Sequence, residues 1–291
     1  MFKYYALIII AVVMFGGCFK LNDVYRKLRG AGIVASISMS FISSVAAILP
    51  MMIIAGFDFS ITPFTAIMCF AGIVNGLLFS YCSIMALGKI NLSLYALFSM
   101  LGGMVLPFIQ GIAFYDEPIT VAKIVCFVLI TVALVISTGK LDKVGGGFIY
   151  YAGIFILNGM SGVISKIFVS APFEKTSSQT YSMWGSVLSA AVCGVILLVI
   201  YLVRKPEKGE GVLSILAASS GGIVNKVANL LLVISLGFVD SSLQYPLVTG
   251  GVMIVSAVFS LFDRDKKVKL SELISVGVAF LGTLALFLIP V

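Results

Sequence analysis

Apolar residues fill long stretches of this chain, and polar and charged residues gather in the short intervals between them. Each stretch is about as long as the 20 or so residues that an α-helix needs to cross a bilayer. The strands of a membrane β-barrel would instead show short segments of alternating polarity. We therefore predict ten spanning helices, at residues 4–20, 31–55, 62–87, 90–114, 119–139, 149–170, 177–203, 212–236, 240–262 and 270–290.

The composition supports an all-α integral membrane protein. Of the 291 residues, 60% are hydrophobic and 11% are charged, whereas soluble domains have about 25% charged residues. The basic residues lie in short intervals between apolar stretches and form no single patch, so we expect no nucleic-acid partner. We expect membrane lipid to surround the chain.

Short motifs recur along the chain at nearly constant separation. Gly-Ile-Val-Asn at 72–75 recurs at 222–225, and Tyr-Tyr-Ala at 4–6 recurs at 150–152. These matches predict a duplication, with one five-helix repeat at 1–145 and a second at 146–291. Because five is odd, the second repeat enters the membrane in the opposite orientation. Inverted repeats can exchange conformations, which is the geometry of alternating access.

This organisation resembles the EamA-type branch of the drug/metabolite transporter superfamily. Pro107 and Glu117 are similar to the proline of that family's fourth helix and the glutamate that follows the helix. Lys20 and Lys166 end the first and sixth predicted helices, as the resemblance also implies. The second half departs from the pattern, because its proline is Pro246 and its acids are rearranged. The resemblance implies a secondary transporter of small molecules.

The basic residues also predict an orientation. The intervals after odd-numbered helices contain 14 of the 19 lysine and arginine residues. By the positive-inside rule these intervals face the cytoplasm, so both termini face outward. The branch that the chain resembles usually has both termini in the cytoplasm. We expect a multi-pass protein of the cell membrane, such as the bacterial inner membrane.

One basic residue, Lys226, falls near the middle of a predicted helix, where a charge costs several kcal/mol unless it is paired or lines a wet cavity. Asn225 and Asn229 lie four residues apart on one helical face beside it. The functional interpretation is a donor-rich strip that binds an anionic or carboxylate-bearing substrate. Alternatively, Lys226 binds carbonyls of a broken helix or extends to the membrane surface.

Other polar and aromatic residues fall within the predicted helices. Asn75 is the repeat mate of Asn225, and Asn158 is a further amide; each faces the cavity or makes an interhelical hydrogen bond worth about 1 kcal/mol. Trp184 and Tyr81 lie deeper than the other aromatic residues and could surround a ligand, including a cation. A position near a span end favours an interfacial anchor for three tyrosines: Tyr95, Tyr181 and Tyr245, the last beside Gln244.

Several chemistries are excluded or disfavoured. The chain has no histidine, the commonest metal ligand and general base. Its five cysteines form no C-x-x-C pair and are typical of small core residues. We expect no metal, no cofactor and no enzymatic activity. No acid lies clearly in the middle of a span, unlike the buried glutamate of the superfamily's small multidrug pumps.

These observations lead to one expected function and two alternatives. We expect a secondary transporter that moves an amino acid, organic acid or phosphorylated metabolite, as in metabolite export, through a central midplane cavity, with or without a coupling ion, as a monomer or homodimer. A flippase for a lipid-linked or phosphate-bearing lipid, and an exporter of organic cations, stay open. The predicted substrate-binding residues are Lys226, Asn75, Asn225, Asn229, Trp184, Tyr81, Asn158, Tyr95, Tyr245 and Gln244.

Overall fold

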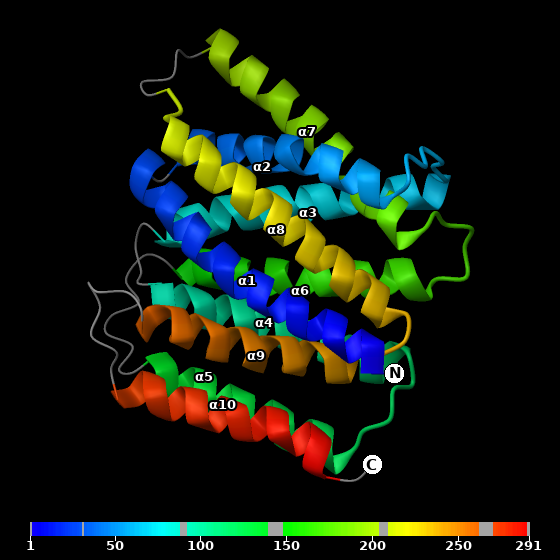
Figure 1. Ribbon diagram of the computed structural model, residues 1–291, viewed down its shortest axis with the longest axis vertical. Coiled ribbons are helices and arrows are strands. Elements are labelled where there is room, and N and C mark those ends of the chain that lie inside the picture. The colour runs from blue at the N-terminus through cyan, green and yellow to red at the C-terminus, as the bar shows by residue number, and fades with distance from the viewer. Residues whose placement is uncertain are drawn as a thin grey trace.

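The computed structural model describes residues 2–30, 32–87, 92–138, 148–203, 209–261 and 270–289, and within these ranges the chain is helical with no strand. Successive helices run back and forth, so that α1 begins and α10 ends on the same side of the bundle (Figure 1). The helices are α1 (Phe2–Arg29), α2 (Ile33–Ile54), α3 (Pro63–Leu87), α4 (Leu92–Phe114), α5 (Val121–Thr138), α6 (Phe148–Ser170), α7 (Ser178–Val203), α8 (Val212–Leu236), α9 (Ser241–Leu261) and α10 (Leu270–Leu288).

Each helix lies within or close to one of the predicted ranges. The largest difference is at α1, which continues past the predicted end at residue 20 to Arg29. Its last turns carry charged residues that pair with one another and with the α7–α8 connection: Arg29 binds Glu210 at 2.8 Å, and Asp23 binds Arg26 at 2.9 Å. These ion pairs allow the helix to extend beyond its apolar part. The predicted boundary between repeats, at residues 145 and 146, lies outside the described residues.

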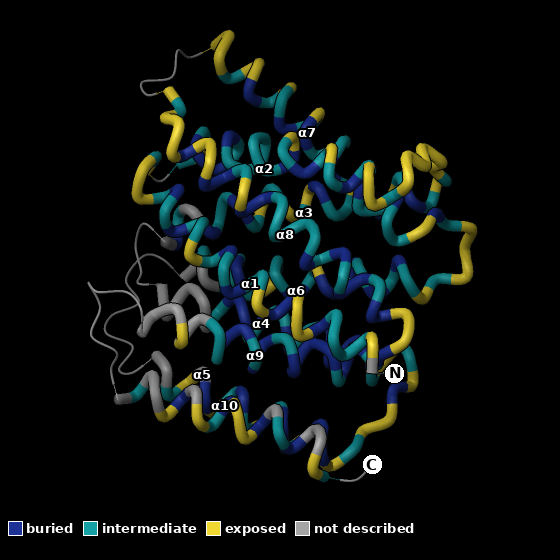
Figure 2. The backbone as a smooth tube through the Cα atoms, viewed as in Figure 1, coloured by how far each residue is buried: buried dark blue, intermediate teal, exposed yellow. Residues whose placement is uncertain are grey.

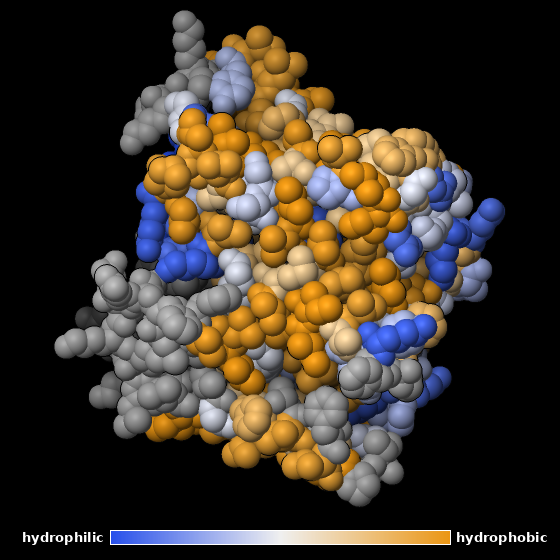
Figure 3. All heavy atoms as spheres, in the orientation of Figure 1, coloured by the Kyte–Doolittle hydropathy of each residue, from blue (hydrophilic) through white to orange (hydrophobic). Residues whose placement is uncertain are grey.

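Within the part of the chain that the structure describes, six helices are long and apolar enough to cross a membrane, as expected of a multi-pass membrane protein. They are Lys3–Arg29, Ile33–Ile54, Pro63–Ser83, Ala152–Ser170, Ser178–Val203 and Val212–Leu236. Apolar residues cover most of the face shown in Figure 3, and polar residues gather toward the two ends of the bundle. Such a surface is stable in lipid, where acyl chains surround apolar side chains as well as protein does.

The helices pair mainly with partners that are distant in sequence. The most extensive pairings join α1 with α8, α5 with α10, α4 with α6, and α2 with both α7 and α8. Buried residues are frequent in the middle of the bundle, and exposed residues are frequent at its margins (Figure 2). Every one of these pairs joins a helix of residues 1–145 with a helix of residues 146–291, so the two halves of the chain interleave in one bundle.

Small residues allow α8 to cross α2 at close range. A Cβ added at Gly222 of α8 would overlap the backbone of Ser43 on α2. The hydroxyl of Ser43 donates a hydrogen bond of 2.9 Å to the carbonyl of Ala218. Van der Waals packing and such hydrogen bonds are the main attractions between helices in lipid. They fix α8, and with it Lys226, against α2.

Candidate functional site

Lys226 lies on the part of α8 that is enclosed by other helices. It is half-buried. One turn further along, Leu230 packs against Met51 of α2 and Met183 of α7. One turn before it, Gly222 crosses α2. Residues four apart share a helical face, so Lys226 lies on the same side of α8 as these two contacts.

The ammonium group of Lys226 lacks a partner among the described residues. Its Nζ makes no hydrogen bond and no ion pair with any residue in the described ranges. The thiols of Cys69 on α3 and Cys193 on α7 lie within electrostatic range of it. By contrast, Lys123 and Lys166, both buried, pair with carboxylates at 2.9 and 2.7 Å. An unpaired charge at this depth requires water or a ligand around it.

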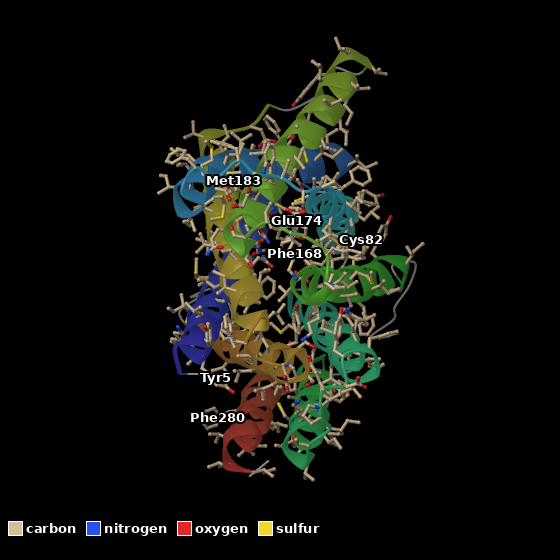
Figure 4. The ribbon with its side chains drawn as sticks, turned by 90° about the vertical axis from the view of Figure 1, so that its right-hand side faces the viewer. Tyr5, Cys82, Phe168, Glu174, Met183 and Phe280 are labelled. Atoms are coloured by element: carbon tan, nitrogen blue, oxygen red, sulfur yellow. The ribbon has the colours of Figure 1, made fainter. Side chains whose placement is uncertain are left out.

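Tyr181 brings a second polar group to the same region from α7. Its ring stacks on Phe168 of α6 with centroids 4.0 Å apart, and its carbonyl accepts a hydrogen bond of 3.6 Å from the thiol of Cys69. Its hydroxyl lies 3.7 Å from the place of a Cβ at Gly72 on α3, and no described residue hydrogen-bonds it. Phe168 and Met183 mark the α6 and α7 sides of this region in Figure 4.

Hydroxyl groups continue the polar lining along α2, α3 and α7. Ser36 and Ser40 of α2 donate hydrogen bonds of 3.0 and 3.1 Å to the hydroxyl of Ser80 on α3. Ser44 of α2 donates one of 2.9 Å to Ser189 of α7. The helices next to Lys226 therefore carry hydroxyls, thiols and apolar side chains. We define the Lys226 site as Lys226, Tyr181, Cys69, Gly72 and Cys193.

Asn225 and Asn229 share one face of α8, as predicted, but that face is turned toward α1. The amide of Asn229 donates to the side-chain oxygen of Asn225 at 3.0 Å and to its carbonyl at 2.9 Å. Asn225 in turn contacts the thiol of Cys18 on α1. Consecutive residues of a helix are about 100° apart. Lys226 therefore faces α3 and α7, and the predicted strip is divided between two faces of α8.

Asn75 and Asn158 both connect α6 to the first half of the chain. Asn75 donates a hydrogen bond of 2.9 Å to the carbonyl of Leu157. Asn158 donates one of 2.6 Å to the carbonyl of Ser99 on α4. These bonds hold α6 between α3 and α4, which is the interhelical alternative that the sequence left open for each amide.

Trp184 and Tyr81 lie toward opposite ends of the bundle. The indole nitrogen of Trp184 donates a hydrogen bond of 3.0 Å to the carbonyl of Ser60, just before α3 begins at Pro63. Tyr81 lies roughly 27 Å further along α3, at a rise of 1.5 Å per residue, with its ring 6.2 Å from that of Tyr150. The two residues therefore do not surround one ligand.

The interfacial role favoured for Tyr245 is wrong, because its side chain is buried between α9 and α6. The hydroxyl donates a hydrogen bond of 3.1 Å to the carbonyl of Gly162. Tyr181 is also turned inward. The neighbouring Gln244 is fully buried; it donates to the carbonyl of Leu232 at 3.0 Å and accepts from Ser235 at 2.7 Å. The side chain of Tyr95 lies outside the described residues.

Glu117 forms the most extensively bonded ionic site in the described ranges. Its carboxylate accepts hydrogen bonds from Lys166 of α6 at 2.7 Å and from the first residues of α9: the backbone N–H and hydroxyl of Ser241 at 3.0 and 2.8 Å, and the backbone N–H of Ser242 at 2.8 Å. Burial favours the protonated carboxyl, but these donors outweigh it and lower the pKa of Glu117 from 4.5 to about 2. The sequence pointed to both charged residues only through a family resemblance and did not pair them.

Comparison with known proteins identifies a solved structure with a similar fold and gives no information on function. No protein-family model matches the sequence, and no curated protein matches it. The chain superposes on a solved crystal structure with a TM-score of 0.72, over 96% of this chain and 99% of that chain. The two sequences are 13% identical. The likeness shows that the helical arrangement is shared with a protein of known structure.

Proposed function

We propose that this protein is a secondary transporter of the ten-helix, inverted-repeat type, which moves a small polar metabolite by alternating access. The pattern of helix packing supports the repeat. In an inverted repeat of five helices, α1 is equivalent to α6, α2 to α7, and so on to α5 and α10. Exchanging each helix for its equivalent turns the pair of α1 and α8 into the pair of α6 and α3. It likewise turns the pair of α4 and α6 into the pair of α9 and α1. Both converted pairs also pack together. A twofold relation between the halves has this property.

The observation that carries the proposal is the unpaired ammonium group of Lys226. A structural lysine in a bundle is expected to have a carboxylate or carbonyl partner, as Lys123 and Lys166 have. An ionisable residue without such a partner, enclosed by α2, α3 and α7, is typical of a substrate or ion pathway. A bound anion would supply the missing partner and leave again on the other side of the membrane.

Polar contacts between the halves would close the site at the end of the bundle where α1 begins. Thr176 donates to the hydroxyl of Thr65 from its backbone at 3.1 Å, and Thr180 donates to Asp58 at 2.8 Å. The pair of Glu117 and Lys166 joins the same end of α6 to the connection between α4 and α5. Access from this side requires these contacts to separate, so they are the candidate gate.

The test is substrate counterflow in proteoliposomes. Vesicles are preloaded with one unlabelled amino acid, organic acid or phosphorylated metabolite, and uptake of the same labelled compound is measured. We expect uptake with the wild-type protein for one class, loss with Lys226→Ala, and normal uptake with Lys3→Ala, which removes a lysine from the exposed start of α1. If no class is taken up while a labelled phospholipid crosses the vesicle membrane, the protein is a flippase and the proposal is wrong.

A further inference from the structure

We infer that the Lys226 site binds a small monocarboxylate, a substrate of net charge −1. This inference rests on the proposed transport function and selects one of the metabolite classes that the function leaves open. Three features of the site carry it: one unpaired positive charge, the lack of a nearby carboxylate among the described residues, and a lining that is partly hydroxylic and partly apolar.

The charge of the site is set by Lys226 alone. Both other lysines that are buried in the described ranges are neutralised, Lys123 by Asp240 and Lys166 by Glu117. The thiols of Cys69 and Cys193 add no negative charge, since thiols have ordinary pKa values of about 8.5. When the amine of Lys226 is protonated, the empty site therefore carries a charge of +1.

No described carboxylate lies beside Lys226 to bind the ammonium group of an amino acid. Two acids of the described ranges pair near the ends of the bundle, Asp23 with Arg26 and Glu210 with Arg29. Others lie in connections or at a helix start, as Asp58, Glu117 and Asp240 do. With a zwitterion bound at Lys226, the net charge of the site and its ligand would be +1, and with a phosphate dianion it would be −1. Only a monoanion brings this net charge to zero.

Net charge decides between these classes because the site lies where the dielectric constant is low. A net charge that remains in such surroundings is costly, and an opposite charge close to it removes most of that cost. A carrier must also move its loaded site through the membrane repeatedly. A neutral complex of Lys226 with a monocarboxylate meets this requirement without a second ion.

We assign two donors to one carboxylate, Lys226 and the hydroxyl of Tyr181. Both residues lie near Cys69: Lys226 is within electrostatic range of its thiol, and the backbone carbonyl of Tyr181 accepts a hydrogen bond of 3.6 Å from it. Neither donor is used within the described structure. Gly72 and Gly76 of α3 leave room on the facing side: a Cβ at Gly76 would meet nothing within 4 Å. The body of the substrate would then lie near Met51, Met183 and the serine hydroxyls of α2 and α3, which suits a short apolar or hydroxylated chain.

The inference is tested with a set of ligands matched in size and different in charge. Lactate, alanine, lactamide, malonate and phosphoglycolate are titrated against the purified full-length protein, and the melting temperature is followed, since a ligand that binds the folded state raises it by mass action. We expect lactate to stabilise the wild type and lactamide not to. Lys226→Gln should weaken lactate binding by roughly 100-fold.

Tyr181→Phe provides a second variant that keeps the ring, its stacking on Phe168 and the charge of the site. It should weaken lactate binding roughly tenfold through loss of one hydrogen bond to a charged group. Lys226→Arg, which keeps the charge, should retain binding better than Lys226→Gln. Equal lactate affinity in the wild type, Lys226→Gln and Tyr181→Phe would overturn the site.

Counterflow of the same five compounds separates the two proposals. If alanine, phosphoglycolate or malonate binds and is transported in a manner that depends on Lys226, the proposed transport function is supported and the monocarboxylate inference fails. If no compound binds and none is transported, both proposals fail. Uptake of lactate that is lost in Lys226→Gln supports both.

Discussion

Replacement of Glu117 by Gln should destabilise the protein strongly at neutral pH. The side chain keeps its shape, but it loses its negative charge. In the wild type, the carboxylate pairs with Lys166 and accepts three hydrogen bonds from Ser241 and Ser242. Both side chains of the ion pair are nearly buried, with 5% and 9% of their surface exposed. Removal of one partner therefore leaves an uncompensated charge at Lys166, which costs about 3–5 kcal/mol.

The pKa of Glu117 gives a second measure of the same interaction. A decrease from 4.5 to about 2 on folding corresponds to about 3 kcal/mol at pH 7, at 1.36 kcal/mol per pKa unit. Because the folded-state pKa is the lower one, this stabilisation is complete above 4.5 and is lost as the pH falls through 2. By pH 3 it should be less than half of its value at pH 7.

The assay is thermal unfolding of the detergent-solubilised wild type, Glu117→Gln and Asp116→Asn between pH 7 and pH 3. At about 2–4 °C per kcal/mol, a loss of about 3–5 kcal/mol means that Glu117→Gln should melt roughly 6–20 °C below the wild type at pH 7, and the difference should shrink toward pH 3. Asp116 is the matched control: it is the preceding acid, it is exposed, and its φ of 51° is one that Asn also tolerates.

Two results would refute this reasoning. The first is an unchanged melting temperature in Glu117→Gln at pH 7, which would mean that water replaces the carboxylate without cost. The second is a difference that stays constant down to pH 3, which would place the effect outside the titration of Glu117. The double variant Glu117→Gln with Lys166→Met should recover part of the loss, because it leaves no buried charge unpaired.

Three further variants and one fusion test other parts of the structure. Lys226→Met should raise the melting temperature of the ligand-free protein by several degrees, since it removes an unpaired charge from the bundle; a decrease would mean that Lys226 has structural partners. Gly222→Ala should cost about 1–3 kcal/mol by overlap with Ser43, whereas Gly17→Ala, which meets nothing within 4 Å, should not. Gln244→Ala should cost about 1–3 kcal/mol, since it leaves buried groups on α8 unpaired; a neutral result would contradict this assignment. A C-terminal reporter that is active only outside the cytoplasm should be active, and one active only in the cytoplasm should not.

The sequence was sufficient to place the helices. Each of the ten predicted ranges overlaps a helix of the described structure, because helix length, glycine and proline positions and charged intervals are local properties of the chain. The place of Lys226 near the middle of its predicted span was also visible, since it can be counted along the sequence. Its unpaired state was not, because partners come from other helices.

What the sequence could not determine is how each helix is rotated and which helix it meets. In water, the polar face of a helix points outward and reveals the rotation; in lipid, the outer face is as apolar as the inner one, so that signal is lost. The inward positions of Tyr181 and Tyr245 and the contact of Asn225 with α1 therefore had no clear sequence signal. The same reason hid the pairing of Glu117 with Lys166, 49 residues later. The chain determines its helices locally, whereas only tertiary packing brings Tyr181 and Lys226 to Cys69 and leaves the hydroxyl of one and the ammonium group of the other without a partner among the described residues.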